Sequence, residues 1–348
     1  MKIGFCVNNM QTEVVRYTTT DLALAATHMG HESWYISVGD LAYDQDEAIH
    51  AHACRVAKTN HRTGAAYLKD LQGKEAVREY INVSELDALL LRNDPAEDIR
   101  TRPWARLAGI NFGRFAARSG VLVLNDPEGL GNALNKLYLQ QFPQAVRPRC
   151  LITRDPDRIK AFVKAEDGRA VLKPLFGSGG RNVFLLRPED VPNMNQIIES
   201  VARDGYIIAQ EYLPEAVRGD TRLFLMNGEP LQYKGKTAAL RRVRADGDMR
   251  SNITAGATSE RGEVSDRMLG IVKSIGPRLK HDGMFFVGLD IVGDKLMEIN
   301  VFSPGGLDSA EVFEQVNFCQ VIVKDIERKV ELKKSSENSF TNRELATL

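Results

Sequence analysis

FFVGLDIVGDKLMEINVFSP, residues 285–304, has the pattern of a β-hairpin that carries polar side chains among apolar ones. Asp290 lies on the first strand, and Glu298 and Asn300 lie on the second. Side chains alternate between the two faces of a strand, so Glu298 and Asn300, two residues apart, point the same way. The register of the hairpin then determines whether Asp290 joins them.

The loop between the two strands sets this register. A three-residue loop, Gly293-Asp294-Lys295, places Asp290 opposite Glu298 and leaves a wholly apolar second face. A two-residue Gly-Asp turn would place the charge of Asp290 among apolar side chains, which is energetically costly. We therefore predict the three-residue loop, a common hairpin form with a bulge. The predicted apolar face consists of Leu289, Ile291, Met297, Ile299 and Val301.

Two carboxylates and an amide oxygen on one face suit a hard cation. Mg²⁺ prefers oxygen ligands and usually holds substrate phosphates at the same time. The hairpin therefore predicts a site for Mg²⁺ (or Mn²⁺) formed by Asp290, Glu298 and Asn300. The alternative is the solvated polar face of a surface hairpin.

The composition is that of an ordinary globular protein with two or three packed units. The 348 residues are 43% hydrophobic and 26% charged, and Lys+Arg and Asp+Glu balance at 46 each. Nothing global attracts nucleic acid or an anionic membrane, and no apolar run is long enough for a membrane span. Four widely spaced cysteines without a CxxC pair indicate reduced thiols and a cytoplasmic setting.

Strands and helices alternate in the first third of the chain. Strand-like runs are found at 1–8, 33–38, 85–92 and 121–126. Between them lie predicted helices, among them Asp21–His28, preceded by Thr20 as N-cap, and Trp104–Arg118. This βαβ order predicts a Rossmann-like α/β domain with a parallel sheet covered by helices on both faces. The polar segment 40–80 is expected to contain helix, and the alternative is an excursion from that sheet.

After Pro127 the pattern changes to short strands, turns and fewer helices, which predicts an α+β architecture. Helices are expected at 132–141, 156–165, about 264–281 and about 309–330, with a hairpin around Asn227-Gly228. The polar final residues are expected to be disordered. We predict an N-terminal α/β substrate-side domain at 1–126, a small lobe at 127–209, a large lobe with the metal hairpin at 210–330 and a disordered tail at 331–348.

A second chemical signal is LKPLFGSGGRNVFLL at 172–186. Gly177, Gly179 and Gly180 allow backbone N–H groups to approach a polyphosphate, and Lys173 offers a positive charge. The run matches neither a Walker loop nor a dinucleotide-binding motif, because a β-like segment follows it. It predicts a glycine flap between two strands over a nucleotide. A glycine turn without function is the alternative.

Three further segments carry weaker signals. The strand IIAQEYLP, 207–214, could present backbone groups and Glu211 to adenine, or it could be a plain core strand. Asp220 and Arg222 begin another strand, where a salt-bridged arginine is the alternative. The loop at 239–257 gathers Arg241, Arg242, Arg244 and Arg250 among small residues, and we interpret it as a lid over anionic groups rather than a solvated basic loop.

With these pieces in order, residues 1 to about 325 closely resemble bacterial glutathione synthetases of the ATP-grasp superfamily. The resemblance rests on LLRNDP (90–95), VLKPLFGSGG (171–180), AQEYLP (209–214), GDTRLFLMNGEPL (219–231), RSNITAGA (250–257) and VGLDIVGDKLMEINVFSP (287–304). It implies an N-terminal α/β (pre-ATP-grasp) domain followed by two α+β lobes that hold ATP between them. Small-molecule substrates and a homo-oligomer are also implied.

The resemblance implies a role for each matching residue. ATP would be bound by Lys136, Lys173, Gly177, Ser178, Gly179, Gly180, Gln210, Glu211, Tyr212, Leu213 and Asp220. Catalysis would involve Lys173, Arg222, Arg242 and Asn252. The peptide substrate would be bound by Arg92, Arg242, Arg250, Asn252, Ser303, Pro304 and Gly305. The metal would be held by Asp290, Glu298 and Asn300, in agreement with the hairpin argument.

The implied reaction joins γ-glutamylcysteine to glycine through an acylphosphate, with ATP converted to ADP and phosphate. One departure matters, because the bacterial enzymes tend to follow Ser-Pro with Thr and a nearby Arg-Glu pair, whereas this chain has Ser303-Pro304-Gly305-Gly306. The alternatives are another ATP-grasp ligase with a different acceptor amine, a kinase-like ATP-grasp protein and a nucleotide-binding module without catalysis.

Overall fold

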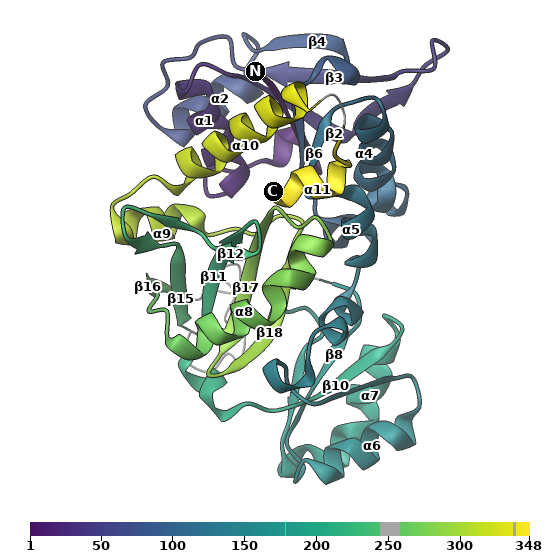
Figure 1. The fold of residues 1–348 in the computed structure, drawn as a ribbon. Helices are drawn as coiled ribbons and strands as arrows, with labels where there is room; N and C mark the ends of the chain where they lie inside the picture. The colour runs from purple at the N-terminus through teal and green to yellow at the C-terminus, as the bar shows by residue number, and fades with distance from the viewer. Residues whose placement is uncertain (178, 244–257, 337–338) are drawn as a thin grey trace.

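The computed structural model describes residues 1–177, 179–243, 258–336 and 339–348. Figure 1 shows the N-terminal sheet at the top, the lobe containing α8 and β17 below it on the left, and the lobe containing α6 and α7 at the bottom right. The long helix α10 (Phe318–Ser335) returns to the N-terminal part and lies beside α1 (Thr18–His28). The ends of the chain therefore meet on the same domain.

The N-terminal sheet has the strand order β4-β3-β2-β1-β5-β6. Its parallel part consists of β2 (Glu32–Tyr43), β1 (Lys2–Val7), β5 (Ala88–Leu91) and β6 (Leu122–Leu124). The outer strands β3 (Ile49–Arg55) and β4 (Val77–Asn82) are antiparallel. The predicted parallel sheet is confirmed for these four strands, whereas the polar segment 40–80 extends the sheet with antiparallel strands and contains the helix α2 (Gly64–Gln72).

Two predicted helices of this part begin or end elsewhere. α1 begins at Thr18 rather than Asp21, so Thr20 lies inside the helix and is not its N-cap. The predicted helix Trp104–Arg118 is a 3-10 turn, η3 (Pro103–Leu107), followed by α4 (Ala108–Arg118). Together, η3 and α4 lie where the single helix was predicted, although η3 begins with a proline and α4 contains glycines.

The small lobe is an antiparallel sheet with the strand order β7-β10-β8-β9. Its strands are Cys150–Thr153, Ile207–Glu211, Ala170–Pro174 and Phe184–Leu186, and its helices are α6 (Pro156–Ala165) and α7 (Met194–Ala202). The single helix predicted at 132–141 was wrong. It is divided into α5 (Pro127–Asn132) and the 3-10 helix η4 (Lys136–Gln141), whose N-cap Asn135 accepts a hydrogen bond from Leu137 N.

The large lobe contains the sheet β16-β15-β11-β17-β18, with β12 (Glu229–Pro230) paired to β11. The strands are Thr258–Arg261, Ala239–Val243, Asp220–Met226, Phe286–Val292 and Lys295–Asn300. The helix α8 (Asp266–His281) contributes buried Ile271, Val272, Ile275 and Leu279 to a core shared with β11 and β17. The predicted helix at 264–281 is confirmed. The predicted closing helix is α9 (Leu307–Glu314) followed by α10.

The β17–β18 hairpin has the predicted pairing but not the predicted loop. Val292 pairs with Lys295, so the turn contains two residues, Gly293 and Asp294. A bulge at Met297 then shifts the register by one residue, and Asp290 pairs with Glu298. The two-residue turn was rejected in the sequence argument because a bulge within the strand was not considered. The bulge also turns Met297 to the cleft described below, instead of the apolar face.

The prediction of disorder after residue 330 was wrong for the residues that the structure describes. α10 continues to Ser335, and α11 (Asn342–Thr347) packs with Leu345 and Ala346 buried. Asn342 accepts a hydrogen bond from Val123 N and donates one to Val123 O, at 2.8 and 3.0 Å. The Thr341–Glu344 capping box is the sequence signal that could have predicted this helix. Within the described ranges, none of the helices could cross a membrane.

Candidate active site

Arg222, Asp290 and Glu298 form one row across β11, β17 and β18. Strand register pairs Arg222 with Asp290 and Asp290 with Glu298, so the predicted pairing of the two carboxylates is confirmed. Arg222 donates from Nε to Asp290 Oδ1 and from Nη2 to Asp290 Oδ2, both at 2.8 Å. Asp290 is only 3% exposed, whereas the Glu298 side chain is 42% exposed. The row therefore leads from a buried ion pair to a carboxylate that solvent or a ligand can reach.

A second arginine joins the row from β15. Arg242 Nη2 lies 2.7 Å from Asp290 Oδ2, and Arg242 Nε donates to Asp220 Oδ1 at 2.7 Å. Burial alone would raise the pKa of Asp290, but Arg222 and Arg242 outweigh it and hold that pKa well below its usual range. Burial would likewise lower the pKa of Arg242, and Asp290 with Asp220 raises it instead. Asp290 and Arg242 therefore compensate each other's buried charge.

The predicted metal ligands fit a divalent cation. Asn300 Nδ2 donates to Asp290 Oδ2 at 3.2 Å, so the amide reaches the buried carboxylate, and Glu298 faces the same side. In the described part of the chain no cluster of three or more His, Cys, Asp or Glu side chains could hold a metal. The third donor of this set is an amide oxygen, which suits Mg²⁺. A cation at this place would share Asp290 with two arginines.

Two lysines of the small-lobe side lie across from this row. Lys136 Nζ, at the start of η4, is 3.5 Å from Glu298 Oε1 and donates to the carbonyl of Gly177. Lys173 lies on β8, and burial lowers its pKa to about 8 although Glu298 opposes that shift. Lys136 and Lys173 line the cleft itself, together with Glu298. The two lysines therefore offer positive charge to an anionic ligand.

The structure brings four of the eleven predicted nucleotide residues to this cleft, namely Lys136, Lys173, Gly177 and Gln210. It is lined by Lys136, Lys173, Gly177, Gln210, Glu298, Asn300 and Ser303, together with Phe176 and Met297. The sequence argument did not identify the last two. Phe176 lies under Arg106, whose guanidinium carbon is 4.4 Å from the ring centroid. Met297 reaches the cleft because of the bulge, and no sequence pattern located that bulge.

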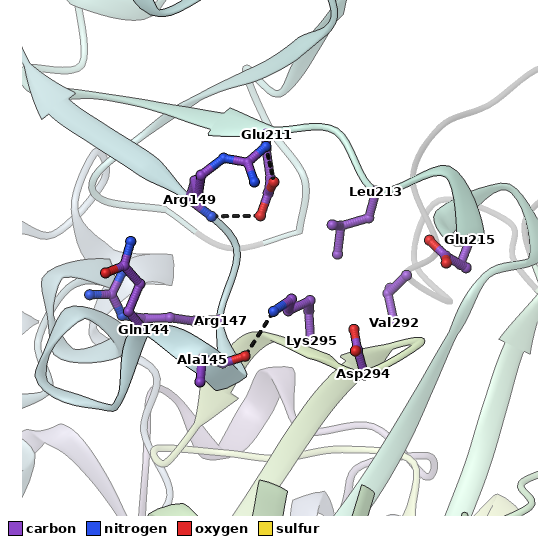
Figure 2. Close-up of a pocket in the computed structure, with 10 residues that line it drawn as sticks. All are labelled: Gln144, Ala145, Arg147, Arg149, Glu211, Leu213, Glu215, Val292, Asp294 and Lys295. Atoms are coloured by element: carbon purple, nitrogen blue, oxygen red, sulfur yellow. Dashed lines mark hydrogen bonds and ion pairs between the residues drawn. The ribbon is translucent and has the colours of Figure 1, made fainter. Parts of the chain in front are cut away.

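Glu211 and Leu213 line a neighbouring cavity of about 520 Å³ at the hinge between the lobes (Figure 2). Glu211 binds Arg149 twice, through Arg149 N at 2.7 Å and Arg149 Nη2 at 2.6 Å. Across the cavity Lys295 Nζ donates to Ala145 O at 2.7 Å. The predicted adenine and ribose residues are thus divided. Gln210 lines the cleft, whereas the side chains of Glu211 and Leu213 face the hinge cavity.

Arg92 and the loop 303–306 extend the site toward the N-terminal domain. Arg92 is buried, donates from Nε to Thr19 Oγ1 at 3.2 Å and from Nη2 to Pro304 O at 3.3 Å. Arg222 Nη1 donates to the next carbonyl, that of Gly305, at 3.1 Å. Burial lowers the pKa of Arg92 to about 10. Two arginines therefore hold neighbouring carbonyls of one loop, one from each side.

Some predicted residues lie outside the described ranges. These are Ser178 of the glycine flap and Arg244, Arg250 and Asn252 of the predicted lid. Gly179 and Gly180 have φ values of +70° and +69°, a backbone region that favours glycine. The flanks of the lid are described and form the antiparallel pair β15–β16, with Arg242 opposite Ser259.

Comparisons with known proteins place this architecture in a family. The model of the prokaryotic glutathione synthetase N-terminal domain matches residues 1–131, and that of the prokaryotic glutathione synthetase ATP-grasp domain matches residues 135–315. The chain belongs to the prokaryotic glutathione synthetase family. It is therefore an ATP-grasp ligase, an enzyme that uses ATP as co-substrate to form a C–N bond with release of ADP.

Curated relatives agree with this assignment, and solved structures share the fold. Glutathione synthetase of Vibrio parahaemolyticus is 33% identical over 95% of this chain and 99% of its own. That of Gloeobacter violaceus is 37% identical over 91% of this chain and 93% of its own. D-cycloserine synthetase DcsG shares the fold with a TM-score of 0.61 and 13% identity, covering 93% of this chain and 99% of that one. ATP-grasp ligase PsnB has a TM-score of 0.58 at 19% identity, covering 93% and 98%.

Proposed function

We propose that the enzyme joins glycine to γ-glutamylcysteine, with ATP converted to ADP and phosphate. Family membership supports the substrates, and one observation supports the chemistry. Arg222, Asp290 and Glu298 form a continuous row that runs from a buried ion pair into a cleft with Lys136 and Lys173 on its other side. A row of this kind positions a triphosphate next to a carboxylate and compensates the negative charge of both.

The reaction has two steps. The cysteinyl carboxylate attacks the γ-phosphorus of ATP, ADP leaves, and an acylphosphate forms. The amine of glycine then attacks the acyl carbon and phosphate leaves. In phosphoryl transfer a protein contributes mainly by positioning groups and stabilising charge. Lys136 and Lys173 bind phosphate oxygens, whereas Arg222 orients the carboxylate from its place between Asp290 and Gly305.

Asp290, Glu298 and Asn300 would hold Mg²⁺ or Mn²⁺, which when bound neutralises charge on the β- and γ-phosphates. Asp290 stays ionised at every physiological pH, because Arg222 and Arg242 keep its pKa low. Asp220 does not act on substrate directly in this proposal. It holds Arg242, and through Arg242 it fixes the orientation of Asp290.

The loop 303–306 bears on one part of the proposal, the identity of the acceptor amine. Gly305 leaves open space, since a Cβ atom built on it would meet no atom within 4 Å. A small acceptor such as glycine suits a loop without side chains, although so would a larger amine in the same space. A ligase with a different acceptor amine is therefore the second candidate.

Acceptor choice distinguishes the two candidates. Purified enzyme with ATP, Mg²⁺ and γ-glutamylcysteine should release ADP at a substantial rate only when glycine is added. Mass spectrometry should then find the tripeptide amide and free phosphate. Release with alanine or glutamate but not glycine would favour the second candidate. A phosphoester product would indicate a kinase instead of a ligase.

A further inference from the structure

One segment of the N-terminal domain contacts the small lobe at the glycine flap, which connects β8 to β9. The segment runs from α3 (Pro95–Asp98) to η3, and its Arg106 lies over the ring of Phe176, with 4.4 Å between the guanidinium carbon and the ring centroid. A cation at this distance is attracted by the face of an aromatic ring. Phe176 immediately precedes Gly177, the first glycine of the flap. The pair therefore holds the residue from which the flap begins.

The same segment contacts the other side of the flap. Arg100 Nη2 donates to both carboxylate oxygens of Asp204, at 3.0 and 3.3 Å. Asn182, two residues after the last glycine of the flap, donates from Nδ2 to Asp204 Oδ2 at 2.5 Å. Burial raises the pKa of Glu97 on α3, and Arg181, the residue that follows the flap, opposes that rise. Both flanks of the flap thus face charged side chains of one N-terminal segment.

The segment is fixed within its own domain by Asn8, the residue after β1. Asn8 Oδ1 accepts a hydrogen bond from Asp94 N at 2.7 Å, and Asn8 Nδ2 donates to Asp94 O at 2.9 Å. The buried Asp98 accepts from Asn8 Nδ2 at 2.8 Å and from Arg102 Nε at 2.9 Å. Asp94 also lines the cleft. The segment is therefore in place before a nucleotide binds, which reduces the ordering cost of binding.

The flank at Phe176 leads to a lysine of the cleft. The carbonyl of Gly177 accepts a hydrogen bond from Lys136 Nζ, which lies 3.5 Å from Glu298 Oε1. Phe176, Gly177 and Lys136 all line the cleft. A shift of Phe176 would carry the Gly177 carbonyl with it and change the position of the Lys136 amine. Arg106 can therefore influence the charges of the cleft through Phe176.

The placement of these contacts indicates a role other than holding the fold together. The Arg100 side chain is 64% exposed, and an exposed ion pair contributes little to stability. The two arginines nevertheless come from one segment and reach the two flanks of one loop, at Phe176 and next to Asn182. A contribution to folding would not require that arrangement, whereas fixing the loop relative to the cleft would.

We propose that Arg106 and Arg100 are positioning residues for ATP, which act from the N-terminal domain on the phosphate-binding side of the small lobe. Arg106 fixes Phe176 and, through it, the amine of Lys136, whereas Arg100 fixes the opposite flank of the flap. The inference rests on the proposed function, since it takes Lys136 to bind phosphate oxygens, but it does not depend on the identity of the acceptor amine. The N-terminal domain thereby contributes to the affinity for nucleotide.

The affinity of the full chain for AMP-PNP with Mg²⁺, measured by isothermal titration calorimetry, tests the inference without turnover. We expect Arg106→Ala to raise the Kd about twofold to tenfold, the range for a partly exposed cation–π pair. Arg106→Lys keeps a cation over the ring and should retain most of the affinity. In a Phe176→Leu background, Arg106→Ala should cause no further loss, because its partner is already absent. The control is Arg118→Ala, which removes a matched pair within the N-terminal domain, 5.6 Å from the ring centroid of Phe115.

The second arginine has a matched control of its own. Arg100→Ala should raise the Kd of AMP-PNP about twofold to fourfold, as expected for an exposed ion pair. Arg114→Ala breaks a comparable pair with Glu128, at 2.9 Å, and should leave this Kd unchanged. An equal rise in the two variants would contradict a specific role for Arg100.

Steady-state kinetics separates positioning of ATP from a general effect on the fold. Arg106→Ala should raise the KM for ATP by the same factor as the Kd and leave the KM for γ-glutamylcysteine unchanged. An unchanged Kd, an equal loss in Arg118→Ala, a further loss in the Phe176→Leu background, or an equal rise of both KM values would each overturn the inference. The expected Kd values without glycine-dependent release of ADP would instead overturn the proposed function alone.

Discussion

At the scale of single residues, the site depends on the contrast between a buried and an exposed carboxylate. Asp290 is fixed by Arg222 and Arg242, whereas Glu298 lies 3.5 Å from Lys136 and also faces Lys173. Removal of a partner from the buried network leaves a charge uncompensated and damages the fold. Removal of the exposed Glu298 carboxylate leaves no buried charge uncompensated. A substitution at Glu298 therefore tests catalysis without damaging the fold.

We predict that Glu298→Ala lowers kcat/KM at least about a hundredfold, because one donor to the cation and its phosphates is lost. The Mg²⁺ concentration needed for half-maximal rate should rise as well. The melting temperature should change little, since the Glu298 side chain is 42% exposed. Glu199→Ala, on the exposed face of α7, is the control. Unchanged kcat in Glu298→Ala would refute a ligand role for this residue.

The lowered pKa of Lys173 predicts that ATP binding depends on pH. Burial lowers the pKa of its amine from 10.5 to about 8, so the free enzyme loses this charge as pH rises through 8. A phosphate favours the charged form, and the KM for ATP should therefore rise above pH 8, by at most about tenfold per pH unit. Lys173→Arg retains its charge and should show a flat profile over the same range. Parallel profiles for the two proteins would show that Lys173 is not the group whose titration governs ATP binding.

At the scale of elements, alternation along strands was sufficient to predict which polar residues share a face. The sequence could not show the bulge at Met297, because a bulge and a longer loop produce the same pairing of Asp290 with Glu298. The contact of Arg242 with Asp290 was also beyond reach, since it crosses from β15 over β11 and depends on the order of strands. A local sequence pattern specifies which face of a strand a side chain occupies, whereas tertiary packing determines which side chain it contacts.

Two adjacent glycines of the loop 303–306 give a matched pair of substitutions. Gly306 has φ +94° and a Cβ built there would lie 2.8 Å from Leu240 Cδ2, so Gly306→Val should destabilise the protein. Gly305 has neither restraint, and Gly305→Val should fold. Its side chain would enter the space next to the peptide site. The KM for peptide or glycine should then rise severalfold with little change in the KM for ATP. Equal changes in all three would place this loop away from the acceptor.

At the scale of the whole molecule, the N-terminal domain and the large lobe are joined by buried polar contacts. Asn125 donates to Phe286 O at 3.1 Å and accepts from Phe286 N at 2.8 Å. A Cβ on Gly129 would lie 1.8 Å from Asp282 O, so the two backbones touch. The small lobe contacts the rest of the molecule through an exposed pair, Arg100 with Asp204 at 3.0 Å, and through a buried hydrogen bond from the Tyr138 hydroxyl to Asp282 Oδ2 at 2.9 Å.

The helix α11 should contribute to the stability of this joined body. Asn342 bonds both backbone groups of Val123 on the edge strand β6, and Asn342→Ala would leave them without partners. We predict a loss of about 1–3 kcal/mol and a fall in melting temperature of about 2–6 °C by calorimetry. Asn195→Ala, on the exposed face of α7, is the control. An unchanged melting temperature would mean that α11 contributes little to the fold.

The sequence predicted an N-terminal domain followed by an ATP-grasp domain and the pairing of Asp290 with Glu298 in the hairpin, yet it missed this terminal helix. Polar composition outweighed the short capping signal at Thr341–Glu344, and burial of Leu345 and Ala346 depends on the surface of β6 and α10 that no local pattern shows. The division of the predicted adenine residues between the cleft and the hinge cavity could not be predicted from a local pattern either. It follows from where β10 (Ile207–Glu211) ends relative to the hinge.

In the proposed reaction, the row of Arg222, Asp290 and Glu298 positions ATP and a substrate carboxylate, and the carboxylate is activated by phosphorylation. Transfer of an isotope tests it most directly. γ-Glutamylcysteine labelled with ¹⁸O in its cysteinyl carboxylate should yield phosphate that contains one ¹⁸O atom for each amide formed, because the carboxylate oxygen that attacks the γ-phosphorus leaves with it. Amide formation with unlabelled phosphate would contradict the account.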